Sequence, residues 1–305
     1  MRLTYPPVRA VAAILAVALT IAACGESDPA PEPTGEGSFD AERAFADLEA
    51  QVEIGPRPAG SPANRRTAEL IADRLDDAGV EDIQIQHPWR NVVGTIPGDE
   101  PDAIVVGAHF DTKDIPGFVG ANDGASGVAV VLELARALEG GPLDGPSVHL
   151  ALFDAEEARG DRPFEVDGTR GSRQYVRLAR AGAQGTPELR RLGAMILFDL
   201  VGDCDLAIPR EAGSDRDLYE HIAAAAEAVD GTAAPFEGAA PPVLDDHVPF
   251  TDAGVPAVDL IDFDFGPGPS PGEYWHTTED TLEKVCPQSL DAVGEAVLRI
   301  LPPPK

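Results

Sequence analysis

The chain has 305 residues, of which 43% are hydrophobic, so it is long enough to bury one large core or two small ones. Its 53 acidic and 23 basic residues give a formal net charge of −30. Nucleic-acid backbones are bound by clustered lysine and arginine, and no basic stripe occurs here. We therefore expect no nucleic-acid partner.

The amino terminus is typical of an exported protein. Arg2 and Arg9 precede an apolar run, Ala10 to Ala23, which is too short to span a bilayer but suits the core of a secretory signal. The run ends Ile-Ala-Ala-Cys, which resembles the lipobox of bacterial lipoproteins, where the cysteine carries a diacylglycerol. The alternative is an ordinary signal peptide cut near Ala23. The pattern predicts a lipoprotein signal peptide at 1–23, lipidation at Cys24, and a protein anchored to the cell membrane facing outside the cytoplasm.

The next segment, residues 24–38, is rich in Pro, Gly and Glu and predicts a flexible tether. Residues 39–305 show no internal repeat and no second shift in composition, which favours a single domain. This domain contains Cys204 and Cys286. An exported chain permits a disulfide, but their spacing is equally compatible with two buried free thiols.

Strands alternate with helices along this domain. In chain order, hydrophobic periodicity predicts helices at 41–54 and 62–78, strands at 83–86, 91–96 and 103–108, a helix at 127–138, a strand at 148–153, a helix at 169–181, a strand at 194–198, a helix at 215–228, a strand at 257–261 and a helix at 289–301. This alternation predicts a three-layer α/β fold in which helices flank a mainly parallel sheet.

Polar clusters follow the predicted strands at the edge where α/β proteins place their active sites. A single such residue is usually a cap or turn residue, but five clusters at equivalent points favour a metal site. Together they supply ligands typical of zinc, and of two adjacent glutamates one can bind metal while the other acts as general base. The candidates are His109, Asp123, Glu156, Glu157, Asp199 and His276.

The order of these residues resembles the zinc aminopeptidase and glutaminyl cyclase superfamily. The shared pattern comprises His109-x-Asp111, Asp123 in a Gly-rich turn, Glu156-Glu157, Asp199 and His276-Thr277, and the Gly-Pro-Arg-Pro-Ala-Gly-Ser stretch at 55–61 also matches. The resemblance implies a phosphorylase/hydrolase-like fold with a mixed twisted sheet. It also implies that 39–305 is a zinc-dependent catalytic domain acting on peptide or protein amino termini.

The two branches of the superfamily use this set differently. In the cyclases one zinc is held by the residues matching Asp123, Glu157 and His276. Glu156 then moves a proton from the α-amine to the leaving ammonia, and an amino-terminal glutamine becomes pyroglutamate.

In the aminopeptidases two zincs are bridged by the residue matching Asp123, and His109 and Asp199 hold the second ion. There Glu156 activates a water that attacks the first peptide bond. This branch is the alternative function, and a non-catalytic binding protein on the same scaffold is a third.

Local features favour the cyclase branch. The stretch Asp245-Asp246-His247-Val248-Pro249-Phe250 resembles a cyclase motif whose first Asp forms a proton network with Glu156 and Asp199. Trp275 resembles the tryptophan that walls the cyclase pocket. His247 is a candidate substrate-binding residue or a residue that orients Asp245.

Two differences from the animal cyclases concern substrate specificity. Animal cyclases have a second pocket tryptophan after the glutamate pair, whereas residues 158–170 contain only one aromatic residue, Phe164. They also have a histidine where Val258-Asp259-Leu260 stands here. A distant cyclase, or a peptidase with a cyclase-like pocket, would show such differences.

Overall fold

The computed structural model describes residues 38–231 and 233–305. The predicted signal peptide, the lipidation site Cys24 and all but the last residue of the predicted tether lie outside the described residues. Within them, every helix falls short of the length and apolar character that crossing a bilayer requires.

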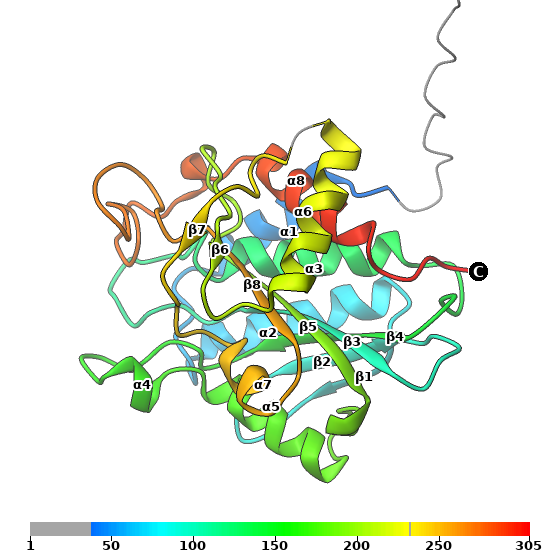
Figure 1. Ribbon diagram of the computed structural model, residues 1–305. Helices are drawn as coiled ribbons and strands as arrows, with labels where there is room; N and C mark the ends of the chain where they lie inside the picture. The colour runs from blue at the N-terminus through cyan, green and yellow to red at the C-terminus, as the bar shows by residue number, and fades with distance from the viewer. Residues whose placement is uncertain (1–37, 232) are drawn as a thin grey trace, which may run out of the picture. The chain divides into compact units, whose positions relative to one another are not determined.

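The centre of the fold is a six-stranded sheet with the strand order β1-β2-β4-β3-β5-β8 (Figure 1). Strand β3 pairs in parallel with β4 and β5, and β5 pairs in parallel with β8. At the other edge, β1 and β2 pair antiparallel with each other and β2 with β4. The bounds are β1 (Glu81–Ile85), β2 (Val92–Ile96), β3 (Ala103–His109), β4 (Ser147–Phe153), β5 (Leu192–Asp199) and β8 (Ala257–Ile261). The predicted fold class, a mixed and mainly parallel sheet flanked by helices, is confirmed.

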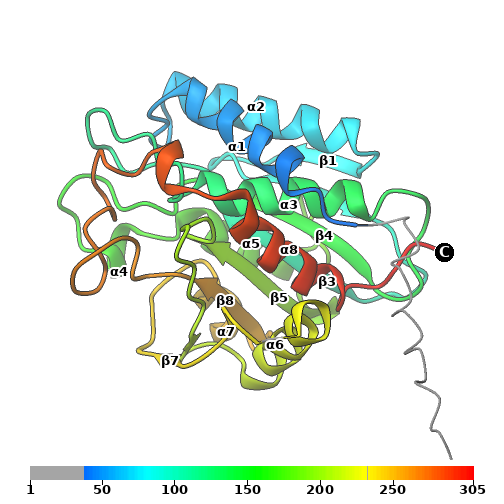
Figure 2. The same ribbon diagram turned by 90° about the horizontal axis from the view of Figure 1, so that it is seen from above.

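Helices cover both faces of the sheet, which makes the three layers (Figures 1 and 2). On one face, α2 (Pro62–Asp77), α3 (Ala125–Ala137) and α6 (Arg216–Asp230) contact the sheet. There α1 (Ala41–Ile54) and α8 (Pro287–Leu298) pack against α3. The other face packs against α5 (Arg170–Ala181) and the short α7 (Val248–Asp252).

Local sequence signals explain where several helices begin. Asp40 caps α1 by accepting a hydrogen bond from the Arg43 amide at 3.0 Å. Ser61 does the same for the Asn64 amide at the start of α2, where Pro62 suits the first helical turn. The predicted helices at 41–54 and 62–78 are therefore confirmed to within one residue.

Helix α3 directly follows the loop that contains Asp123, one of the predicted metal ligands. It is buried on nearly all sides between the sheet and its neighbours. Gly127 allows the close approach, because a β-carbon there would collide with the carbonyl oxygen of Phe198 on β5. The residues that precede α3 are consequently held against the end of β5.

A disulfide joins Cys204, in the loop after β5, to Cys286, at the start of α8. The Cys286 amide also donates to the Gly202 carbonyl at 2.9 Å. Of the two alternatives that the sequence leaves open, the structure has the bonded one. The bond ties together two segments that leave the same end of the sheet.

The sequence does not predict several short elements of the fold. They are α4 (Phe164–Asp167), α7, the two-stranded parallel pair β6 (Arg210–Glu211) and β7 (Ala239–Ala240), and two 3₁₀ turns at Leu189–Arg191 and Leu282–Lys284. Each is too short to develop a hydrophobic period. The resemblance implies a mixed sheet, but no local signal identifies β1 and β2 as the strands that pair antiparallel, because strand direction is set by how the chain returns to the sheet.

Candidate metal centre and active site

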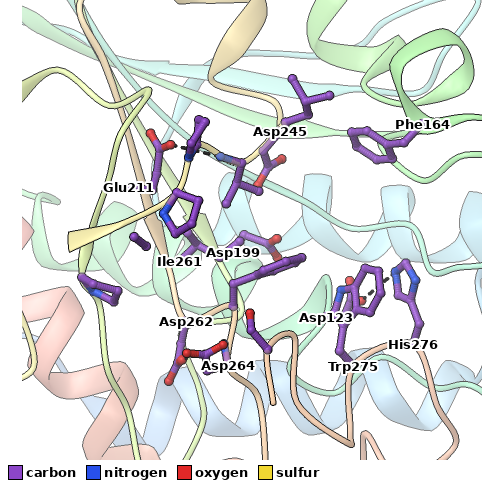
Figure 3. Close-up of a pocket in the computed structure, with 18 of the residues that line it drawn as sticks. Asp123, Phe164, Asp199, Glu211, Asp245, Ile261, Asp262, Asp264, Trp275 and His276 are labelled. Atoms are coloured by element: carbon purple, nitrogen blue, oxygen red, sulfur yellow. Dashed lines mark hydrogen bonds and ion pairs between the residues drawn. The ribbon is translucent and has the colours of Figure 1, made fainter. Parts of the chain in front are cut away.

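The carboxyl ends of the parallel strands open into a pocket of about 690 Å³ (Figure 3). His109 ends β3, the two glutamates follow β4, and Asp199 ends β5. The pocket also receives residues from the loop that precedes α3 and from the loops that follow β7 and β8. Among the predicted site residues, those that line it are His109, Asp123, Glu156, Glu157, Asp199, Asp245, Trp275 and His276.

Two sets of potential metal ligands meet at Asp123. In one set, His109 Nε2 lies 3.3 Å from Asp123 Oδ1 and 3.2 Å from Asp199 Oδ1. In the other, His276 Nε2 lies 3.4 Å from Asp123 Oδ2 and 3.0 Å from Glu157 Oε1. The ligand atoms within each set all lie within 4.8 Å of one another. The structure therefore brings together both ligand sets that the resemblance implies.

The chemistry of these residues fits a divalent cation. Asp123 Oδ2 and Glu157 Oε1 are buried and accept no hydrogen bond, a costly arrangement unless a cation completes it. The Nδ1 of His109 lies 3.1 Å from the Asp111 carbonyl oxygen and donates to it. This bond leaves the Nε2 lone pair directed at the two aspartates, as in a metal-binding histidine.

Unusual backbone geometry aims the side chains at this point. Gly124, which follows Asp123, has φ +97° in the structure. Ala155, Leu200 and His276 have φ values of +59°, +51° and +53° although none is glycine. Such left-handed residues cost about 1–3 kcal/mol each and concentrate at functional sites. Each lies in, or next to, one of the predicted site clusters.

The Glu156–Glu157 turn is positioned by two residues to which the sequence assigns no role. Asp111 accepts hydrogen bonds from the amides of Glu156 and Glu157 at 3.0 and 3.3 Å. Lys113 Nζ lies 3.1 Å from Glu157 Oε2. Both belong to the polar stretch His109-Phe110-Asp111-Thr112-Lys113 that begins at the end of β3, and their closeness to His109 in the sequence is the signal that could have identified them.

Glu156 is left free for proton transfer. It is 7% exposed and lines the pocket. Burial raises the pKa of Glu156 well above its usual range, although the nearby His109 opposes this and Glu157 adds to it. A carboxyl group with a raised pKa in a pocket is suited to general acid–base work.

Three buried acids, Asp245, Asp246 and Asp259, lie near Asp199. Burial raises the pKa of Asp245 well above its usual range, and the charges of Asp259 and Asp199 add to this. Asp246 accepts a hydrogen bond from the Ser172 hydroxyl at 2.5 Å. Asp259, in the Val258-Asp259-Leu260 stretch, is fully buried with neither carboxylate oxygen hydrogen-bonded. Asp245 is the one of these three acids that also lines the pocket.

His247 lies deeper than a pocket-lining residue. It is 1% exposed, with Nε2 3.5 Å from Glu211 Oε1 and Nδ1 3.6 Å from Asp259 Oδ2. Burial lowers the pKa of His247, so the ring is neutral near pH 7. Its direct contact with substrate stays a prediction, and its position beside Asp259 suits orientation of the acid cluster.

Aromatic side chains wall the pocket. The Trp275 ring stacks on His276 with centroids 3.8 Å apart and packs edge-on against Phe263 at 5.4 Å. Phe164 on α4 also lines the pocket, at a distance from Trp275 in Figure 3. The segment that lacks the second tryptophan therefore places its only aromatic residue in the pocket.

Comparison with known proteins identifies the class. Residues 91–301 match Peptidase family M28, and because this is more than half of the chain, the protein belongs to that family. It is 28% identical over 282 residues to glutaminyl-peptide cyclotransferase of Gloydius blomhoffii, covering 78% of this chain and 75% of that protein.

The chain is also similar to an aminopeptidase and to a solved glutaminyl cyclase structure. Aminopeptidase YwaD of Bacillus subtilis is 31% identical over 205 residues, which cover 65% of this chain. The match spans only 40% of the length of that aminopeptidase. The crystal structure of Acidobacteriales bacterium glutaminyl cyclase superposes with a TM-score of 0.76 at 31% identity, covering 89% of this chain and 97% of that one. Membership of the family and likeness to the cyclases imply zinc at this centre.

Proposed function

We propose that the protein is a zinc-dependent glutaminyl-peptide cyclotransferase that converts an amino-terminal glutamine into pyroglutamate and releases ammonia. The observation that carries the proposal is the pocket itself. It joins one complete ligand set, Asp123, Glu157 and His276, to Glu156 and to a buried acid cluster that can hold protons. The comparisons support it, since the match spans most of a cyclotransferase but less than half of the aminopeptidase.

The chain's own residues can carry the proton through this reaction. Zinc bound to Asp123, Glu157 and His276 would polarise the γ-carbonyl of the glutamine. As the α-amine nitrogen bonds to the γ-carbon, Glu156 accepts a proton from that nitrogen. Glu156 then protonates the amide nitrogen as its bond to carbon breaks, so that ammonia leaves.

The neighbouring residues have supporting roles in the proposal. Asp245 and Asp199 would hold the hydrogen-bond network beside Glu156, and Trp275 would wall the glutamine side chain. We propose a single zinc. Without a second ion, His109 would carry a proton on both ring nitrogens, in keeping with its raised pKa, and would donate from Nε2 to Asp199 at 3.2 Å.

The second candidate is a di-zinc aminopeptidase. The observation that favours it is the additional ligand set formed by His109, Asp123 and Asp199. In that case Asp123 would bridge two ions and Glu156 would deprotonate a water molecule.

The two candidates differ in what leaves the substrate. We expect the zinc-loaded protein to release ammonia from Gln-Ala-Ala amide and to leave pyroglutamyl-Ala-Ala amide, while leucine anilide stays intact. Mass spectrometry and an ammonia assay measure both. Release of free glutamine and of aniline, without ammonia from the peptide, would contradict the cyclase and support the aminopeptidase.

We further propose that the protein is exported and anchored by a lipid on Cys24. The Ile-Ala-Ala-Cys sequence at the end of a short apolar run supports this. Cys24→Ala should release the protein from membranes or block its processing. Unchanged membrane association together with an unchanged mature mass would exclude the anchor.

A further inference from the structure

The pocket extends beyond the metal centre into what we call the acidic arm, the part lined by Glu211, Asp262 and Asp264. In Figure 3 these three side chains lie beyond Asp199 as seen from His276. Eight carboxylates line the pocket, against one side chain from lysine or arginine, Lys113. Five of the eight take part in the proposed chemistry, and the three of the acidic arm do not.

Within the described residues, no lysine or arginine side chain forms an ion pair with the three carboxyl groups of the arm. Asp262 is 3% exposed and accepts hydrogen bonds from the amides of Ala207 at 2.8 Å and Asp264 at 3.3 Å. None of the ion pairs among residues 38–231 and 233–305 involves Asp262 or Asp264. Burial, together with the charges of Asp203 and Asp264, raises the pKa of Asp262 to about 7.

Glu211 provides an independent sign that a ligand completes the arm. It is fully buried, and its Oε2 accepts from the amides of Gly213 at 2.8 Å and Val243 at 3.2 Å. Glu211 lines the same pocket, and its other oxygen, Oε1, is buried and accepts no hydrogen bond. The nearest basic atom, His247 Nε2, is 3.5 Å away on a neutral ring. A buried carboxylate oxygen without a donor is costly unless a bound group supplies one.

A metal ion is not the occupant that the geometry favours. The two groups of potential metal ligands within the described part of the chain include none of the three arm residues. An organic cation with several donors suits the arm better, because a guanidinium or ammonium group can reach spaced carboxylates. Ile261 and Pro209 also line the pocket and offer apolar surface to the methylene stem of such a side chain.

We infer that the acidic arm binds the side chain of an arginine or lysine at the second or third position of the substrate. This inference rests on the proposed function, which places the amino-terminal glutamine at the metal centre. The preferred substrates are then peptides that begin with glutamine and carry a basic residue directly after it or one position further.

Steady-state kinetics of the zinc-loaded protein test the inference. The substrates are the amides of Gln-Arg-Ala, Gln-Ala-Arg, Gln-Ala-Ala and Gln-Glu-Ala. We expect kcat/KM for the better arginine peptide to exceed that for Gln-Ala-Ala by about fivefold or more, and Gln-Glu-Ala to fall below it. Asp264→Asn and Asp262→Asn should bring the arginine-to-alanine ratio close to one and leave turnover of Gln-Ala-Ala unchanged.

A matched control separates the arm from the overall negative charge. Glu69→Gln removes one exposed carboxylate from α2 and changes the net charge by the same amount. If long-range attraction caused the preference, this variant would reduce the ratio as much as Asp264→Asn does. We expect it to leave the ratio unchanged. Because Asp264 is exposed, its variant decides the question even if Asp262→Asn does not fold.

Binding measurements keep this inference distinct from the proposed function. Calorimetry should show that the zinc-loaded protein binds pyroglutamyl-Arg amide more tightly than pyroglutamyl-Glu amide, whether or not it cyclises glutamine. Failure to cyclise any Gln peptide would overturn the proposed function alone. Equal binding of these two amides, or an arginine preference that survives Asp264→Asn, would overturn the acidic arm.

Discussion

The two halves of the metal centre share Asp123 but differ in depth. His109 is 2% exposed at the end of β3, in the half that faces Asp199. The His276 side chain is 20% exposed and lies under Trp275 near the aromatic wall. Substrate can therefore reach the His276 half more easily than the His109 half.

The charges around the two halves differ more than the ligands do. Burial alone would raise the pKa of Glu157, but His276 and Lys113 outweigh it and lower that pKa, so Glu157 is an anion ready to bind metal. Around Asp199 the neighbours are acids, and the charge of Asp199 helps to raise the pKa of Asp245 and Asp259, where burial is the main cause. The His276 half is therefore suited to holding metal, and the His109 half to holding protons.

Removing a ligand of the His276 half should have the largest effect. Asp123→Ala, Glu157→Ala and His276→Ala each delete a ligand that no neighbour replaces, so we expect loss of zinc and of all measurable turnover. Elemental analysis measures the metal. Asp264→Asn, which removes a pocket carboxylate outside the ligand sets, is the matched control and should retain zinc. Full zinc retention by the three alanine variants would contradict the assignment.

Glu156→Gln should separate proton transfer from metal binding. The change preserves shape and removes the base, so turnover should fall by on the order of 10²-fold or more while zinc stays bound. Because the raised pKa of Glu156 leaves the base protonated at low pH, the wild-type rate should fall as pH drops through that pKa. The variant should lack this acidic limb. Near-normal turnover with bound zinc would point instead to Asp199 or Asp245 as the base.

The disulfide should stabilise the frame that both halves share. Cys204 and Cys286 enclose a sequence separation of 82 residues, so replacing both by serine should lower the free energy of unfolding by about 2–5 kcal/mol. Urea unfolding measures this, and reduction of the wild type should reproduce the loss. A double variant with an unchanged unfolding midpoint would show that the bond does not constrain the unfolded chain.

Substitution in the aromatic wall should have the smallest effect on activity, and this effect should be confined to substrate binding at the His276 half. Trp275→Ala removes the ring that stacks on His276, so KM for Gln-Ala-Ala amide should rise about tenfold, with a smaller change in kcat. Trp89→Ala is the control, since Trp89 packs on Arg170 and does not line the pocket. Equal effects of the two substitutions would indicate a general loss of stability.

Much of this arrangement could be predicted from the sequence because its signals are local. The apolar period of α1 and the polar residues directly after β3, β4 and β5 are visible along the chain. Parallel strands bring their carboxyl ends together, so His109 and Asp199 were expected to meet although 90 residues separate them.

The remainder depends on tertiary packing. Asp111 receives the amides of the glutamate turn only because β3 and β4 are neighbours in register. The Cys204–Cys286 pairing follows from the course of two loops. The acidic arm combines Glu211 on β6 with Asp262 after β8, and no spacing in the sequence relates those positions.

Zinc stoichiometry tests the difference between the two halves most directly. If the His276 half holds the metal and the His109 half handles protons, the purified wild type should contain one zinc per chain, and His109→Ala should contain the same amount. An anomalous-scattering map should place the ion among Asp123, Glu157 and His276. Two zincs per chain in the wild type, reduced to one in His109→Ala, would contradict the account and favour the di-zinc aminopeptidase.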